Sequence, residues 1–319
     1  HRTAIRDIDV VRTIMAHQHK ALAELHRMEF GEAAADADAS VVVVGYTADD
    51  EGEFIPGDIS LGQEGAGDGE AKAPARSRGG DRDQLGLKPA HVALIEAAAA
   101  AGKPVIVVIV AGSAVLTEDW REKASAILQT FYAGMEGGTA LAELLLGELS
   151  PSGRLPFTVA RSASDYPLFD RDADTIDYEY WHGYALFDRQ DVEPRYPFGH
   201  GLSYVLFTLR ALKVRQAGNA LEVSVAVTND GALAADEIVQ CYIGCPGVSV
   251  LRPVRALKAF ARVSLRPGET KMVRMTVMLE SLAWRDARAH AWRFENGRYT
   301  VMVGRSSRDK GALVLPADL

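Results

Sequence analysis

The chain has 319 residues, of which 48% are hydrophobic and 24% are charged, and its formal net charge at pH 7 is -8. At roughly 100–200 residues per domain this length predicts two domains, and the acidic balance argues against a nucleic-acid partner, which would need a basic face. No apolar run reaches the ~20 residues that cross a bilayer, so we expect no membrane partner.

Apolar residues recur at roughly helical spacing near the start of the chain, from Val10 to Leu25. We therefore expect residues 1–38 to be an N-terminal helical extension or the remnant of an upstream domain. His17, His19 and His26 lie among these residues, but the H-E-x-x-H pattern of a zinc-binding helix is missing. The sequence therefore predicts no metal site here.

Alternating strands and helices predict an α/β domain over residues 39–160, with a mostly parallel sheet sandwiched by helices. Continuous β-branched runs are typical of strands that are covered on both faces, and Pro near the start and Gly at the end are typical of helices. The predicted strands are 41–45, 105–110, 126–132 and 155–159, and the predicted helices begin at Pro89 and Gly138.

A connecting segment is predicted over residues 161–205, and the pattern of the chain then changes. Short alternating strands follow, separated by turn signals such as Asn-Asp-Gly at 229–231 and Arg-Pro-Gly-Glu at 266–269. This pattern is typical of an all-β, immunoglobulin-like sandwich. We expect that sandwich over residues 206–319.

Two cysteines, Cys241 and Cys245, lie four positions apart, so in a strand their side chains share one face. No second pair completes a four-ligand metal site, and we expect buried, reduced thiols and no cofactor. Reduced thiols and the lack of a visible signal peptide favour a cytoplasmic location. The compartment stays undecided, because the chain begins with His1 rather than Met.

A polar loop follows the first predicted strand and carries eight carboxylates between Asp49 and Glu70, with no Lys or Arg. Loops at the carboxyl ends of parallel strands bind ligands in open α/β sheets, and a loop of some forty residues is often functional. We favour function for its two ends, DDEG at 49–52 and GGDR at 79–82. For the middle part we favour a disordered acidic insertion.

Four motifs occur in order along the chain: VVVVGYTADDEGE from 41, GGDRDQLGL from 79, SPSGRLP from 150 and FGHGLSY from 198. Together they resemble the family 3 glycoside hydrolases. The later stretch RPVRALKAFARVSLRPGET resembles the fibronectin type III-like domain of that family. The resemblance implies the C-terminal α/β sandwich and β-sandwich of a β-glucosidase-like enzyme that hydrolyses terminal β-linked sugars.

The resemblance also implies a division of catalytic labour. In this family an Asp nucleophile lies on an N-terminal TIM barrel, and the general acid/base is usually a Glu in an E-G pattern upstream of a D-R pair. Glu51 matches the E-G position, with Glu64 as the second choice and Glu53 as the third. Asp81 and Arg82 match the pair, and we expect them to contact sugar hydroxyls or to orient the loop by an ion pair.

Cleavage of a glycosidic bond with retention explains why a carboxyl group is needed here. It uses two carboxyl groups ~5–5.5 Å apart, of which one attacks the anomeric carbon and the other protonates the leaving oxygen and later activates water. The proton donor must keep its proton near neutral pH, which burial or neighbouring like charges bring about. A loop rich in carboxylates suits that task.

The aromatic run YEYWHGY supplies Tyr178 and Trp181 as further candidates for substrate binding. Aromatic faces stack on sugar rings, but packing between domains is an equally good use of these side chains. Both interpretations stay open at this point.

Only about 38 residues precede the first predicted strand, whereas a (β/α)8 barrel needs roughly 200 or more. We therefore expect the barrel to be absent and the chain alone to be inactive. Its expected partners are a carbohydrate substrate, a β-glucoside or related, and a separate barrel-bearing chain or a second copy of itself. The alternative is a non-catalytic carbohydrate-binding or scaffold module. A nucleotide-binding protein is disfavoured, because neither G-x-G-x-x-G nor a P-loop follows the first strand.

Overall fold

A computed structural model of the chain describes residues 33–51, 82, 84–170, 173, 175–245 and 249–319. The residues fall into two compact units. The first comprises His1–Gly137, Arg161–Ser164 and Leu168–Asp177, and the second comprises Gly138–Ala160, Asp165–Pro167 and Tyr178–Leu319. The predicted extension over 1–38 lies almost entirely outside the described residues.

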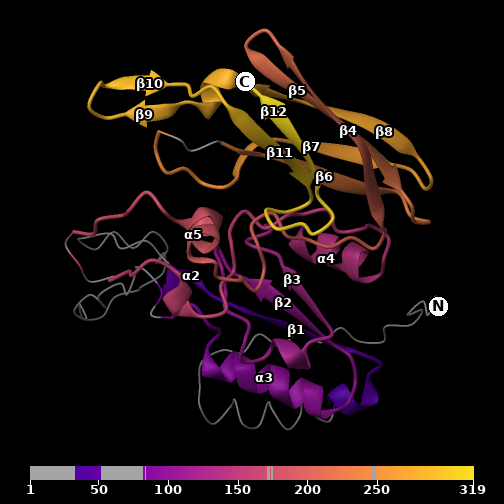
Figure 1. Cartoon of the computed structure of the whole chain (residues 1–319). Helices are drawn as coiled ribbons and strands as arrows, with labels where there is room; N and C mark the ends of the chain where they lie inside the picture. The colour runs from indigo at the N-terminus through magenta and orange to yellow at the C-terminus, as the bar shows by residue number, and fades with distance from the viewer. Residues whose placement is uncertain (1–32, 52–81, 83, 171–172, 174, 246–248) are drawn as a thin grey trace, which may run out of the picture. The chain divides into compact units, whose positions relative to one another are not determined.

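Three parallel strands form the sheet of the first unit in the order β1-β2-β3 (Figure 1). They are β1 (Ser40–Gly45), β2 (Val105–Val110) and β3 (Ala126–Gln129). β1 and β2 pair along their whole length, with Ser40 opposite Val105 and Gly45 opposite Val110. The β-branched runs therefore form buried strands, as the sequence predicts.

Helix α3 (Pro89–Ala100) packs against β1 and β2 and lies along one face of the sheet (Figure 1). Pro89 is tolerated there because the first residues of a helix do not use their amide hydrogens. Ile95 and Ala98 are the buried positions of the helix. The chain then turns at Gly102, whose φ of 69° is readily adopted by glycine. The predicted helix is confirmed.

Two of the predicted strands differ from the structure. β3 ends at Gln129, before the predicted end at 132, because Phe131 has a φ of 55°, which a strand does not allow. Residues 155–159 form no strand. Val159 makes an isolated bridge with Tyr196, and Pro156 lacks the amide hydrogen that a ladder requires.

Two helices lie largely in the second unit, α4 (Gly137–Leu145) and α5 (Gly183–Gln190). α4 confirms the helix predicted from Gly138, and α5 lies inside the predicted connecting segment. Asp188 of α5 pairs with Arg255 at 2.9 Å and with Arg308 at 3.0 Å. These ion pairs tie α5 to the β-rich part of its unit. Single turns of 3-10 helix are η1 (Arg121–Lys123), η2 (Ala163–Asp165) and η3 (Leu279–Leu282).

Two antiparallel sheets, ordered β4-β5-β8 and β12-β11-β6-β7, make up most of the second unit. Their strands are β4 (Phe207–Ala217), β5 (Ala220–Asn229), β6 (Ala235–Gly244), β7 (Ala256–Leu265), β8 (Thr270–Met278), β11 (Arg298–Gly304) and β12 (Leu313–Asp318). A separate hairpin pairs β9 (Trp284–Asp286) with β10 (Ala291–Arg293). The turn predicted at 266–269 joins β7 to β8, and the one at 229–231 follows β5.

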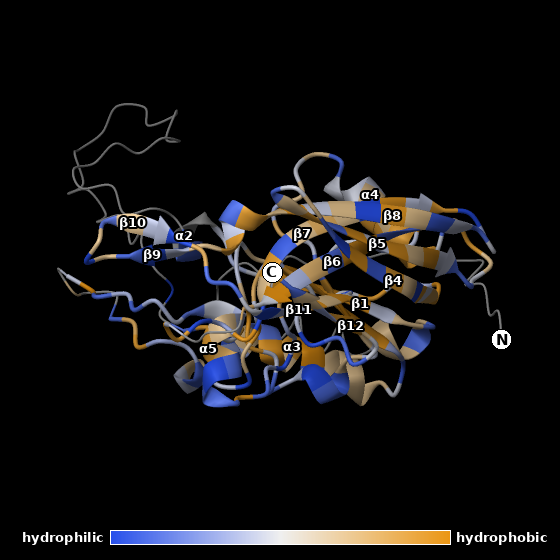
Figure 2. Ribbon diagram, turned by 45° about the horizontal axis from the view of Figure 1, so that its top comes forward, coloured by the Kyte–Doolittle hydropathy of each residue, from blue (hydrophilic) through white to orange (hydrophobic). Residues whose placement is uncertain are grey.

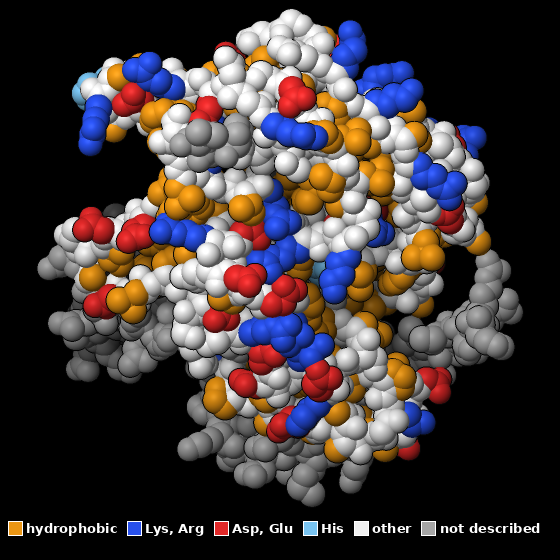
Figure 3. All heavy atoms as spheres, viewed as in Figure 1, with side chains coloured by type: hydrophobic (Ala, Val, Ile, Leu, Met, Phe, Trp, Pro, Cys, Tyr) orange, Lys and Arg blue, Asp and Glu red, His pale blue; other side chains and the backbone are white. Residues whose placement is uncertain are grey.

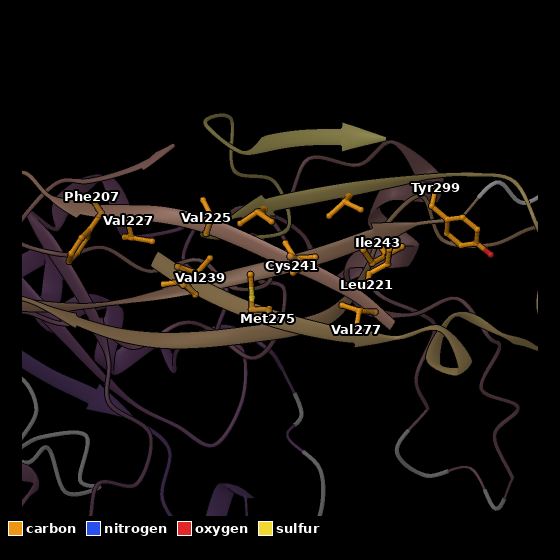
Figure 4. Close-up of a cluster of buried hydrophobic side chains, with 14 of the residues drawn as sticks. Phe207, Leu221, Val225, Val227, Val239, Cys241, Ile243, Met275, Val277 and Tyr299 are labelled. Carbon is orange, nitrogen blue, oxygen red and sulfur yellow. The ribbon is translucent and has the colours of Figure 1, made fainter. Parts of the chain in front are cut away.

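The core of the sandwich is built from alternate residues of the strands (Figure 4). In β5 the positions Leu221, Val225 and Val227 are all at most 1% exposed. The less buried positions that alternate with the apolar ones are Glu222, Ser224 and Ala226, which gives the period-two pattern of a half-buried strand. Cys241 of β6 is buried in the same core as a free thiol. Full burial of one Leu or Val side chain, such as Leu221 or Val225, stabilises the fold by about 1.5–3 kcal/mol.

The hydropathy of the chain follows this architecture, with hydrophobic residues along the strands and polar residues in many of the turns (Figure 2). Acidic and basic side chains are intermingled over much of the face shown in Figure 3. Within the described residues, no helix combines the length and apolar character needed to cross a membrane.

Candidate active site

The carboxyl ends of β1, β2 and β3 meet at the side chain of Glu51. Glu51 is the last residue of α2 (Ala48–Glu51), a short helix just after β1. Its Oε2 accepts a hydrogen bond of 2.9 Å from the amide of Gly112, which follows β2, and another from the hydroxyl of Tyr132, which follows β3. This edge is where open α/β sheets bind their ligands.

Arg82 completes the surroundings of Glu51. Its Nε lies 3.3 Å from Oε1 of Glu51, and its Nη2 donates to Oγ of Ser113 at 2.6 Å and to the carbonyl of Ala114 at 2.8 Å. The guanidinium carbon lies 4.6 Å from the centre of the Tyr46 ring, in cation–π geometry. The arginine therefore joins Glu51 to the segment after β2.

The turn that carries Glu51 is held by its neighbour Asp50. The Asp50 carboxylate accepts hydrogen bonds from the amide and hydroxyl of Thr47 at 2.9 and 3.1 Å, and Lys88 lies 2.6 Å away. Partial burial opposes ionisation, but the hydrogen bonds from Lys88 and Thr47 outweigh it and lower the pKa of Asp50. An ionised Asp50 thus fixes the start of α2, and with it the direction of Glu51.

Tyr46 anchors the far side of the cluster. Its side chain is 6% exposed, and its hydroxyl donates to the carbonyl of Gly86. Burial raises the pKa of Tyr46, so the hydroxyl stays protonated and remains a donor. The ring therefore offers Arg82 a rigid face to lie on.

Two hydrogen-bond donors and one cation surround the carboxyl group of Glu51. Oε2 takes both hydrogen bonds. Oε1 is shielded from solvent and accepts no hydrogen bond from the described residues, although Arg82 lies beside it. Oε1 is therefore held against the Arg82 guanidinium.

The other predicted acids are not placed by the structure. Glu53, Glu64 and Asp81 lie outside the described residues. Of the two residues in the predicted D-R pair, only Arg82 is therefore seen in contact with Glu51.

Tyr178 and Trp181 belong to the second unit. Tyr178 is 63% exposed. Trp181 is half-buried and is engaged by two neighbours: the ring of Tyr180 at a centroid distance of 5.1 Å, and the guanidinium of Arg189 at 4.7 Å. Tyr184, in the same aromatic run, accepts a hydrogen bond from the amide of Leu257 and packs against Phe198.

Sequence patterns did not assign Gly112 and Tyr132 to the site. Tyr132 was expected only as the end of a strand, and Gly112 only as the end of an apolar run. The available signal was their position: Gly112 lies two residues after the end of β2 and Tyr132 three residues after the end of β3, and the turn with Glu51 follows β1 in the same way.

No group of three or more His, Cys, Asp or Glu side chains able to hold a metal ion occurs within the described residues. Two hollows of about 400 and 500 Å³ lie on the β-sandwich, lined by residues in and beside β6, β7 and β8. Neither hollow is lined by Glu51. The candidate site therefore depends on the contacts at the sheet edge and not on a cavity.

Comparison with known proteins decides the family. The glycosyl hydrolase family 3 C-terminal domain matches residues 6–204, which is more than half of the chain. The chain belongs to glycosyl hydrolase family 3. The fibronectin type III-like domain matches residues 237–307 of this family 3 chain. These matches confirm the predicted resemblance and the predicted fold, a parallel sheet with helices followed by antiparallel sheets.

Individual relatives carry related names. A β-glucosidase of Bacteroides ovatus is 38% identical over 244 residues, which are 72% of this family 3 chain and 32% of the relative. An exo-α-(1→6)-L-arabinopyranosidase of Bifidobacterium breve is 34% identical and covers 74% of this chain and 32% of its own length. The solved β-glucosidase 3B of Thermotoga neapolitana, in complex with α-D-glucose, aligns with a TM-score of 0.75 at 29% identity over 92% of this chain and 39% of that one.

The chain spans about a third of the length of the curated relatives that it matches. The relatives are named for different sugars, so family membership alone does not name a substrate.

Proposed function

We propose that this chain supplies the general acid/base, Glu51, of a retaining family 3 glycoside hydrolase that acts on terminal β-linked sugars. The observation that carries the proposal is the convergence of three strand ends on the Glu51 carboxylate. A carboxyl group that is held from several sides has the fixed direction that proton transfer requires.

Glu51 has one task in each half of the reaction. In the first half it gives a proton to the glycosidic oxygen as the bond from that oxygen to the anomeric carbon breaks and the nucleophile binds that carbon. In the second half the ionised Glu51 takes a proton from water, whose oxygen displaces the nucleophile.

The second carboxyl group comes from elsewhere. The family resemblance assigns the nucleophile to an Asp on a barrel, a region that does not correspond to the part of the relatives matched by this chain. Catalysis then requires the two regions to work together, either on one polypeptide or as separate chains.

Arg82 has a positioning role in this proposal. Its guanidinium is engaged by Glu51, Ser113, Ala114 and the Tyr46 ring, which favours orientation of Glu51 over direct contact with sugar hydroxyls. Asp81, Tyr178 and Trp181 stay proposed sugar contacts, and Glu64 stays the second choice for the acid/base.

The test uses the chain together with a family 3 barrel, on one polypeptide or added in trans, and compares Glu51→Gln with wild type. With phenyl β-glucoside, whose leaving group needs a proton, turnover should fall by about 10²–10⁴-fold. With 2,4-dinitrophenyl β-glucoside the first step needs little acid and should be nearly unchanged. Added azide should restore turnover and give β-glucosyl azide.

Glu122→Gln is the matched control, because Glu122 lies in the same unit and is 79% exposed. It should leave both substrates unaffected. Wild-type activity of Glu51→Gln on phenyl β-glucoside would falsify the assignment.

A second candidate function is a non-catalytic carbohydrate-binding module. The exposed rings of Tyr178 and Tyr180, at 63% and 68% exposed, favour it, since exposed aromatic faces stack on sugars. This alternative gains if sugars bind the chain through these rings while no barrel restores turnover.

A further inference from the structure

The geometry points to Tyr132 as a positioning residue for the candidate acid/base: together with the Gly112 amide, its hydroxyl holds Oε2 of Glu51, so that the carboxyl group keeps one orientation. This inference rests on the proposed function of Glu51 and adds to it a residue to which neither the family match nor the sequence motifs assign a role.

The contact itself joins two distant parts of the chain. The Tyr132 hydroxyl donates to Oε2 of Glu51 across a separation of 81 positions. Partial burial and this hydrogen bond raise the pKa of Tyr132 to about 12, although the nearby Arg82 works in the opposite direction. The hydroxyl therefore stays protonated, and stays a donor, over the pH range in which a glycosidase works.

The backbone before Tyr132 is shaped for this contact. Phe131 has a φ of 55°, a left-handed conformation that is unfavourable for a bulky side chain and persists where the surroundings hold it. The change of direction ends β3 and brings the next residue to α2. Unfavourable backbone conformations such as that of Phe131 cluster at functional sites, and the residue after it contacts Glu51.

The backbone at Gly112 leaves room for the phenol and the carboxylate together. A Cβ atom at this position would lie 3.2 Å from Oε2 of Glu51 and 3.2 Å from a ring carbon of Tyr132. The amide of Gly112 also donates to the same Oε2. Backbone, phenol and carboxylate are therefore packed against one another, which limits the movement of the Glu51 carboxylate.

Packing does not explain the position of this ring. Tyr132 is 57% exposed, whereas Tyr299 is fully buried and bonds its hydroxyl to the carbonyl of Glu295 at 2.6 Å. A buried tyrosine stabilises its domain mainly by the area that it removes from water. Loss of the exposed Tyr132 hydroxyl should leave the folding stability nearly unchanged and act on Glu51 alone.

The experiment compares Tyr132→Phe with Tyr204→Phe, in the chain combined with a family 3 barrel. Tyr204 is a fitting control because it is 54% exposed and its hydroxyl bonds to the carbonyl of Leu144 at 2.9 Å. Tyr132→Phe should lower turnover of phenyl β-glucoside by about tenfold to a hundredfold, as expected for a lost hydrogen bond to a charged group. The kcat/KM for 2,4-dinitrophenyl β-glucoside, which reports only the first half of the reaction, should change by less than about twofold.

The two proposals are separated by the leaving-group split, which is a larger loss of activity on phenyl β-glucoside than on 2,4-dinitrophenyl β-glucoside. If Glu51→Gln shows the split and Tyr132→Phe behaves like Tyr204→Phe, the role of Tyr132 is wrong and that of Glu51 stands. If Tyr132→Phe slows both substrates equally, the residue is only structural. If Glu51→Gln shows no split, the proposed function fails and the role of Tyr132 fails with it.

A spectroscopic readout tests the contact in the 319-residue chain itself. With 13Cζ-labelled tyrosine, the signal missing from Tyr132→Phe identifies Tyr132 in the NMR spectrum. That signal should stay at the position of a neutral phenol up to pH 11 in wild type. In Glu51→Gln it should move at lower pH, toward the ordinary value near 10. Titration of Tyr132 at the ordinary value in wild type overturns the inference.

Discussion

Arg154 donates a hydrogen bond to the carboxylate of Glu237, and both side chains are almost completely buried, with 7% and 1% of their areas exposed. Arg154 lies in the SPSGRLP motif and Glu237 in β6, so a loop and a sandwich strand share one buried ion pair. Gly201 lies against the arginine, since a Cβ there would be 2.8 Å from its Nη1. Two of the motifs that resemble family 3 therefore meet at one guanidinium.

The Arg154→Met variant should lower the free energy of unfolding by about 3–5 kcal/mol, because it removes the cation that pairs with the buried Glu237 charge. The double variant Arg154→Met, Glu237→Leu should recover much of this loss, since both charges are then gone. Urea unfolding of the single and double variants measures the difference. Equal stability of the two would show that the buried charge is not the cause.

Gly45, at the end of β1, should tolerate no side chain. A Cβ atom there would lie 1.8 Å from the carbonyl oxygen of Val110, and the φ of 152° is one that residues with side chains rarely adopt. Gly45→Ala should therefore cost about 3 kcal/mol or more in unfolding free energy. Gly86→Ala is the control, since no atom lies within 4 Å of its Cβ position, and should change stability by less than about 0.5 kcal/mol. Similar melting temperatures for the two variants would contradict the close approach.

Gly112→Ala should affect activity and spare the fold. Its Cβ would lie 3.2 Å from the Glu51 carboxylate, so the carboxylate must shift by a few tenths of an ångström. Misplacement of this order at a reacting group should lower turnover of phenyl β-glucoside by roughly tenfold. The assay uses the chain combined with a family 3 barrel, and circular dichroism checks the fold. Unchanged turnover would argue that the Glu51 position is not critical.

Protonation of Asp309 should lower the stability of the chain in acid. Its carboxylate accepts hydrogen bonds from the amides of Arg305 and Gly311, both at 2.9 Å, and from Nε of Arg305 at 3.0 Å. Burial works against ionisation, but these donors lower the pKa of Asp309 below its usual value. Because the pKa in the folded state is lower than in the unfolded state, the stabilisation is present above the unfolded value near 3.9 and is lost as the pH falls through the folded value.

Urea unfolding at pH 7, 5, 4 and 3 checks this expectation. The free energy of unfolding of wild type should fall below pH 4 more steeply than that of Asp309→Asn. At pH 7 the variant should be less stable by about 1–3 kcal/mol, because it loses a charged acceptor. Parallel pH profiles would assign the acid sensitivity to other groups.

Local patterns in the sequence were sufficient for most of the secondary structure. The β-branched runs of β1 and β2, the Pro and Gly that bound α3, and the alternation in β5 and β8 each reflect a backbone preference or a period that acts within a few residues. The strand predictions failed where the backbone conformation of a single residue was incompatible with the apolar strand pattern around it. Phe131 ended β3 early, and Pro156 prevented a strand whose neighbours were suitable.

The candidate site also contains one part that the sequence predicted and one part that only the fold determined. Glu51 and Arg82 were chosen from motifs, because resemblance to a family needs only residue type and order. Their contact with Gly112, Tyr132 and Ser113 was decided by the parallel pairing of the strands, which places the carboxyl ends of β1, β2 and β3 at one edge. No local pattern encodes a contact between residues 81 positions apart; only the folded sheet brings them within hydrogen-bonding distance.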